Sequence, residues 1–186
     1  PELVDEHKSL VKQAISGDDP NKTASAIQVI EQNPALFEAS IVEPLFSHPE
    51  TEIISMALAL TARNWQGLFE EKFEKSKENQ EVCNLFLGVA LENGLQITQK
   101  SLALLHEHLN EELLPQLRQL MILSNDEAAN DQVISDLQNM QDDEIEYYIE
   151  VAQNFEKNLF IAALLQKLEG HETLKEKYSS YLATGN

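Results

Sequence analysis

The sequence predicts an all-α protein, a right-handed α–α superhelix of about six helical hairpins. Apolar residues recur at helical spacing, as in Ile53, Met56, Ala57 and Leu60. A short polar break also returns about every 31 residues and opens a new apolar stretch. A constant period of this size is typical of a solenoid of stacked hairpins, in which each hairpin covers the apolar face of the next. The breaks fall at residues 18–20, 48–50, 77–79, 109–111, 141–143 and 170–172.

Almost no segment is typical of a β-strand. Sustained alternation of apolar and polar residues with β-branched enrichment is missing from the sequence. The dipeptide Asn93-Gly94 suits a hairpin turn, but it follows a helical pattern and is better placed to end a helix.

After each polar break we expect a helix of about 14 residues that ends near Asn or Gly. Both residue types tolerate the left-handed conformation in which many helices terminate. The expected ends are Asn33, Asn64, Asn93-Gly94, Asn125, residues 154–158 and residues 185–186.

A second, shorter helix is expected between each of these ends and the next break. A shift of two periods supports the repeat, because it aligns Ile53 with Leu114 and Asn64 with Asn125. The competing interpretation is a generic bundle whose helices have similar lengths. The shorter helices are predicted at residues 2–16, 34–47, 65–76, 97–108, 126–139 and 158–168.

The helix starts carry prolines and acids. Pro20, Pro34 and Pro49 are expected in first turns, where the missing N–H has no partner to lose. Pro115 is tolerated for the same reason, whereas Pro44 should bend or end its helix. Acidic residues follow most breaks and meet the positive end of a helix dipole, so part of the acidity is explained by capping.

The stretch from His48 to Ser76 carries a family resemblance. Over the whole chain, the alternation of helices of about 14 and about 12 residues resembles the short HEAT-like repeats of the phycobilisome-lyase class of α-solenoids, and this stretch resembles them in composition as well. The resemblance implies that the shorter helices line a concave side, and no bilin-lyase chemistry is carried over with it. The array opens with a short helix and closes with a long one, so we expect either a fragment of a larger protein or a separate partner that covers an end of the array.

The composition limits the classes of partner. A chain of 186 residues is long enough for one domain, predicted over residues 1–186. Thirteen basic and 32 acidic residues give a formal charge of −19, which repels phosphate backbones and anionic lipid surfaces. We therefore expect a protein partner, a basic one, and neither nucleic acid nor membrane.

Compartment and redox signals are few. One cysteine, Cys83, excludes an internal disulfide and a cysteine-based zinc cluster. No apolar run approaches the ~20 residues that span a bilayer, and no signal-peptide pattern opens the chain. Because the sequence begins with Pro1, we expect processing or excision from something longer. The compartment stays open, with the cytoplasm favoured.

No residue is singled out as catalytic, metal-ligating or cofactor-binding. His106 and His108 are two residues apart, so one should face solvent and the other the edge of the core. Cys83 lies on an apolar helical face and is expected to be a buried structural thiol. Known nucleophile, phosphate-loop and zinc-protease motifs are missing. The aromatic residues Trp65, Phe69 and Phe73 recur every four residues and are expected in the core.

The charge distribution yields the one candidate site. Residues 101–156 carry 13 acidic residues and a single basic one, Arg118. Their densest part, residues 141–150, also contains two tyrosines. It is either a solvated, helix-capping face or a docking surface with an apolar anchor inside an acidic rim. The candidate binding residues are Asp142, Asp143, Glu144, Glu146, Tyr147 and Glu150.

The function that fits best is a non-enzymatic scaffold for protein–protein interaction, with an acidic surface for a basic or extended partner. One alternative is a nucleic-acid mimic that occupies a DNA-binding groove. The others are a cofactor- or enzyme-associated helical-repeat domain, suggested by fold analogy alone, and a purely structural segment of a longer chain.

Overall fold

The computed structural model describes residues 5–183, which form helices and no strand. The all-α class is therefore confirmed. The chain divides into two compact units, Pro1–Asn93 (unit 1) and Gly94–Asn186 (unit 2). Within the described residues no helix has the length and apolarity needed to cross a membrane.

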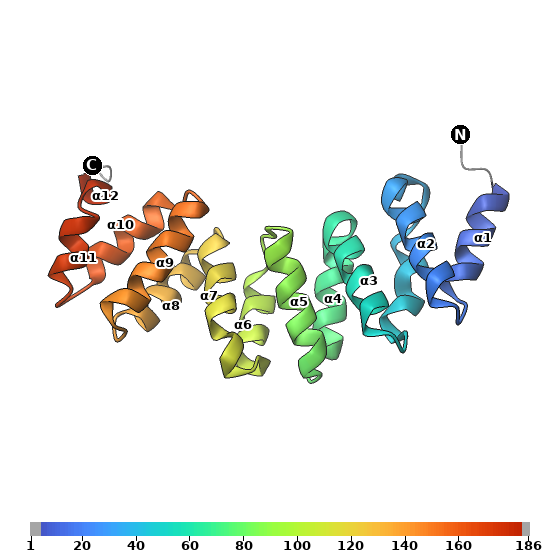
Figure 1. Cartoon of the computed structure of the whole chain (residues 1–186), viewed down its shortest axis with the longest axis horizontal. Coiled ribbons are helices and arrows are strands. Elements are labelled where there is room, and N and C mark those ends of the chain that lie inside the picture. Colours follow the sequence, from blue (N-terminus) through green and yellow to red (C-terminus); the bar gives the residue numbers. More distant parts are fainter. Residues whose placement is uncertain (1–4, 184–186) are drawn as a thin grey trace. The chain divides into compact units, whose positions relative to one another are not determined.

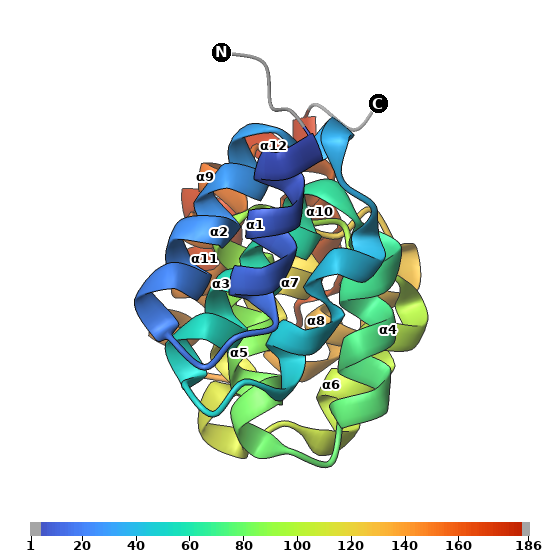
Figure 2. The same ribbon diagram turned by 90° about the vertical axis from the view of Figure 1, so that its right-hand side faces the viewer.

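Unit 1 consists of two layers of helices. The helices α2, α3 and α5 lie side by side in one layer (Figure 1), and α1, the 3₁₀ segment η2 and α4 pack against them. Figure 2 shows α1 beside α2. The bounds are α1 (Asp5–Ile15), α2 (Pro20–Gln32), η1 (Pro34–Leu36), η2 (Ala39–Ser47), α3 (Thr51–Asn64), α4 (Gln66–Ser76) and α5 (Gln80–Glu92).

In unit 2, as in unit 1, successive helices alternate between two layers. The helix α7 packs between α6 and α8 and against α9, and α10 packs on α8 and α9. The bounds are α6 (Gln99–His108), η3 (Glu111–Leu113), α7 (Leu114–Leu123), α8 (Glu127–Leu137), α9 (Asp142–Asn154), α10 (Asn158–Lys167), α11 (Glu172–Lys177) and α12 (Ser180–Ala183).

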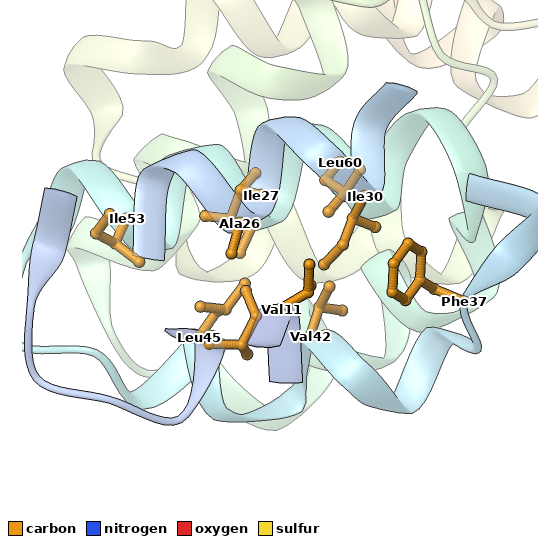
Figure 3. Close-up of a cluster of buried hydrophobic side chains, with 11 residues drawn as sticks. Val11, Ala26, Ile27, Ile30, Phe37, Val42, Leu45, Ile53 and Leu60 are labelled. Atoms are coloured by element: carbon orange, nitrogen blue, oxygen red, sulfur yellow. The ribbon is translucent and has the colours of Figure 1, made fainter. Parts of the chain in front are cut away.

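A shared apolar cluster joins the first two hairpins of unit 1. Figure 3 shows Val11 from α1, Ile30 from α2 and Val42 from η2 pointing into one space with Leu60 from α3. Ile30 and Val42 have no exposed surface, and Leu60 is 1% exposed. Each element supplies one face of this cluster, so no single hairpin buries its own apolar residues.

Aromatic residues form the core between α4 and α5. Phe69 and Phe73 both stack on Phe86, with ring centroids 4.2 Å apart in each pair, and all three side chains are fully buried. The prediction that the aromatic stripe belongs to the core is confirmed for Phe69 and Phe73. Trp65, at the start of the stripe, is half-buried.

The asparagines end helices by a different route from the expected one. The Nδ2 groups of Asn33, Asn64 and Asn93 donate to the carbonyl four residues back, at 3.0, 3.0 and 2.8 Å. No described Asn has a positive φ, so the expected left-handed Asn is wrong. Each side-chain amide thus supplies an additional donor to a carbonyl of the last helical turn, where backbone donors become scarce. Gly94 does adopt the left-handed conformation, with a φ of 58°.

Side-chain caps explain several helix starts. Asp19, Asn79 and Asp126 accept hydrogen bonds from backbone N–H groups of the first turns. Pro20 occupies the first turn of α2, as expected. Pro49 does not, because α3 begins two residues later, at Thr51.

Three predicted helices differ from the structure. The one expected after residue 111 begins with the 3₁₀ turn η3 and is α-helical only over Leu114–Leu123. Residues 34–47 form 3₁₀ segments, with Pro44 inside the second, because a proline within a helix removes an N–H donor and crowds the preceding turn. The expected helix after residue 172 is divided into α11 and α12. Its expected end at 185–186 lies outside the described residues, as does the start of the first predicted helix at residue 2.

The stacked rings make Phe86 a position of unit 1 that is sensitive to truncation. We expect Phe86→Ala to lower the free energy of unfolding of this unit by about 3–5 kcal/mol, because it removes a fully buried ring and leaves a cavity between two others. Urea unfolding followed by Trp65 fluorescence measures it, since Trp65 is the single tryptophan and belongs to unit 1.

Leu10→Ala is the matched control, because this side chain is 57% exposed on the same unit. It should change the free energy of unfolding by no more than about 0.5 kcal/mol. Equal effects of the two substitutions would contradict the assignment of the aromatic stack as the core.

Candidate functional site

The helix α9 is held in unit 2 by side chains from the neighbouring repeats. Gln119 Nε2 on α7 donates to the hydroxyl of Tyr147 at 2.6 Å, and Arg118 Nη1 donates to that of Tyr148 at 3.3 Å. On the other side Gln153 Nε2 donates to the hydroxyl of Tyr181 at 2.9 Å. Each bond joins residues 28 to 30 positions apart. The position of α9 therefore depends on contacts that span one repeat.

The apolar face of α9 determines which of its side chains reach solvent. Ile145, Tyr148 and Ile149 are buried, with exposures of 4% or less. Of the six candidate binding residues, Glu146 is half-buried and the other five are exposed, namely Asp142, Asp143, Glu144, Tyr147 and Glu150.

Three of the candidate carboxylates already have partners. Asp142 Oδ1 lies 2.5 Å from His171 Nδ1. Glu144 Oε2 accepts from the backbone N–H of Gln141 at 3.0 Å and completes a capping box at the start of α9. These two acids are therefore engaged within the fold.

Glu146 is the third carboxylate that has a partner within the fold. Its Oε1 accepts from the ammonium of Lys177 and, at 2.7 Å, from the hydroxyl of Tyr178. Hydrogen bonds from Lys177 and then Tyr178 lower the pKa of Glu146 below its ordinary value. Glu146 thus links α9 to the following hairpin.

The remaining three candidates form one exposed stripe. Asp143, Tyr147 and Glu150 are spaced by four and three residues, so they lie on the same side of α9. The two carboxylates make no hydrogen bond or ion pair with any residue in the described part of the chain. Tyr147 is 46% exposed and its ring meets that of Tyr148 edge-on, with centroids 5.1 Å apart. We call these three residues the α9 stripe.

A hollow of about 350 Å³ adjoins the α9 stripe. Pro115 and Arg118 of α7 form one wall, Met140 lies at the entry to α9, and the stripe residues Asp143 and Tyr147 form the other wall. The hollow thus combines apolar surface with carboxylates at its rim.

Arg118 does not make this hollow basic. Its Nε lies 3.2 Å from Asp136 Oδ2, and its guanidinium is 5.9 Å from the centroid of the Tyr148 ring. Burial opposes its charge, but hydrogen bonds with Tyr148 and Asp136 raise the pKa of Arg118. Arg118 is therefore a paired cation that positions Tyr148.

Sequence reasoning missed Arg118, Pro115 and Met140 as parts of this site. In the sequence, Arg118 is distinguished only as the single basic residue of residues 101–156. The repeat period could have indicated that Arg118 lies beside Tyr148. The two residues are 30 positions apart, and residues one period apart lie on neighbouring hairpins.

The other candidates have the surroundings expected of them. His106 is exposed and His108 half-buried, which confirms their predicted placement. Among residues 5–183 no group of three His, Cys, Asp or Glu side chains is arranged to hold a metal ion. Cys83 has no exposed surface, and its Sγ lies 3.1 Å from the carbonyl oxygen of Lys77. Burial, and to a lesser degree Glu78, raises the pKa of the Cys83 thiol, so the buried thiol is confirmed.

Comparison with protein-family models, curated proteins and solved structures finds no match for this chain.

The buried thiol should react slowly. We expect Cys83 in the folded protein to react with a disulfide reagent such as DTNB at least about 100-fold more slowly than in urea, because it is inaccessible and its raised pKa leaves little thiolate. Absorbance of the released thiolate follows the reaction. A native rate close to the rate in urea would show that Cys83 is accessible.

The Glu146 contacts should give unit 2 a pH-dependent contribution to stability. A lowered folded-state pKa stabilises the fold above the unfolded pKa, and this contribution is lost as pH falls through the folded pKa. We expect Glu146→Gln to lower the urea midpoint at about pH 7, and the difference from wild type to vanish as pH drops below about 4. Far-UV circular dichroism at a series of pH values measures both midpoints.

Glu176→Gln is the control, since Glu176 is exposed and forms no ion pair with a described residue. Its urea midpoint should follow that of wild type at every pH. A Glu146→Gln difference that persists undiminished in acid would contradict the role of the carboxylate charge.

Proposed function

We propose that this protein is a non-enzymatic scaffold for protein–protein interaction, and that unit 2 binds a basic segment of a partner protein at the α9 stripe. The observation that carries the proposal is the selective pairing on α9. Asp142, Glu144 and Glu146 are engaged within the fold, whereas Asp143 and Glu150 are exposed, unpaired and separated by Tyr147.

The spacing of the α9 stripe suits a segment with two basic residues. Asp143 and Glu150 are seven residues apart, which is about 10 Å along a helix. The exposed ring of Tyr147 lies between them and offers its face to the aliphatic stem or the cation of a Lys or Arg side chain. The hollow beside Pro115 and Met140 accepts a neighbouring apolar side chain.

The field of the whole chain supports the same partner class. A formal charge of −19 attracts a basic segment over a distance and raises its rate of association. Specificity then depends on short-range contacts with Tyr147 and the hollow, since long-range attraction does not distinguish among basic partners.

For the architecture, we propose a right-handed HEAT-like solenoid that forms one domain. Side-chain bonds between residues one period apart support it. In unit 1 the Oγ1 of Thr51 donates to Glu81 at 2.9 Å, and Arg63 bonds to Asn93 at 2.9 Å. Such contacts are those of stacked repeats, in which equivalent positions of successive hairpins are neighbours. The compartment stays open, with the cytoplasm favoured.

Binding of a labelled peptide tests the α9 stripe. The probe is a fluorescent peptide of alternating Lys and Leu residues, and its anisotropy reports binding to the full chain. Asp143→Asn combined with Glu150→Gln should weaken binding about fivefold, because two exposed ion pairs of about 0.5 kcal/mol each are lost. Tyr147→Ser should weaken it further, and affinity should fall steeply between about 50 and about 300 mM salt.

The matched control is Glu127→Gln combined with Glu176→Gln, which removes the same two charges from exposed positions elsewhere on unit 2. We expect less than about a twofold effect from it. Equal losses in the two double variants would mean that the peptide responds only to net charge, and the proposed site would be wrong.

A further inference from the structure

Unit 1 contains a groove of opposite character to the α9 stripe. It has a volume of about 510 Å³ and runs between α1 and the 3₁₀ segments. Its apolar wall is formed by Leu36, Phe37, Ile41 and Pro44, and the facing wall carries Lys8 and Lys12. We call it the α1 groove.

The two lysines have little carboxylate pairing within the described residues. Lys12 forms no ion pair with any residue between 5 and 183. Lys8 is 3.9 Å from Asp5, whose carboxylate is fully exposed, so this pair neutralises little. Elsewhere in unit 1, Arg63 is paired with Glu31 and Lys72 with Glu43.

The apolar wall lies where the helical repeat is interrupted. Residues 34–47 form two 3₁₀ segments in place of the α-helix that the period predicts, and Leu36 at their junction is 45% exposed. Departures from local sequence rules concentrate at functional sites. Leu36 has the exposure expected of an anchor site for an apolar side chain.

We infer that the α1 groove binds an acidic segment of a partner protein that carries apolar residues between its carboxylates. Lys8 and Lys12 are one helical turn apart, about 6 Å along α1. Alternate residues of an extended chain are about 6.6 Å apart, so two carboxylates at positions i and i+2 meet the two ammonium groups. A neighbouring apolar residue of that segment then packs on Leu36 and Ile41.

Glu38 is the single carboxylate among the side chains that line the α1 groove. It opposes an acidic segment, as does the charge of −19 over longer distances. Salt screens this repulsion as well as the local ion pairs, so the affinity should change little with ionic strength. This response differs from the steep loss expected at the α9 stripe, and the two sites are therefore distinguishable.

The test uses the full chain and two fluorescent peptides, one of alternating Glu and Leu residues and one of alternating Glu and Ser. Anisotropy should show binding of the Glu-Leu peptide, at least about tenfold weaker binding of the Glu-Ser peptide, and less than about a threefold change in affinity between about 50 and about 300 mM salt. Lys8→Gln combined with Lys12→Gln should weaken the Glu-Leu peptide about fivefold, and Leu36→Ser should weaken it by a similar factor.

The matched control is Lys22→Gln combined with Lys77→Gln, which removes the same charge outside the α1 groove. It should leave binding within about twofold of wild type. Equal effects of the two double variants would overturn the inference. So would tight binding that Leu36→Ser leaves unchanged, or a self-association in sedimentation that Lys8→Gln with Lys12→Gln abolishes, which would make a second copy the occupant.

Discussion

Burial of apolar faces between hairpins is the constraint on which the rest of the structure depends. In unit 1 the cluster around Ile30 and Val42 draws on α1, α2, η2 and α3 together. A helix of 11 to 14 residues is marginal alone in water, so these helices are stable because neighbours cover them. The same packing fixes which side of each helix faces solvent, and so which polar residues are available to a partner.

Some carboxylates of α9 are paired within the fold and others are not, so the acidic residues of this helix differ in their availability to a partner. On α9 the carboxylates of Asp142 and Glu146 meet groups of the following hairpin, and Glu144 closes a capping box. Asp143 and Glu150 project from the side of α9 where no described residue pairs with them. The distinction matters for function because a carboxylate held by an ion pair must lose that partner before it binds another, whereas a solvated one loses only water.

The interruption of the repeat at residues 34–47 has a physical cause with a structural consequence. Pro34 and Pro44 shorten the run in which backbone hydrogen bonds of an α-helix can form, and the chain adopts tighter 3₁₀ turns. Those turns expose Leu36 and leave a groove beside α1. A departure from regular geometry thus contributes the apolar wall of a groove that Lys8 and Lys12 border.

The sequence by itself determined the helical class, most helix bounds and the burial of Phe69, Phe73 and Cys83, because periodicity and caps act over a few residues. It also located the acidic region. The local bonds of the asparagine side chains and of Glu144 escaped prediction because several local alternatives were open to them. Only the tertiary structure decided that Asp142 and Glu146 are occupied. The occupied Asp142 and Glu146 find their partners 29 to 32 residues away, beyond the reach of any local pattern.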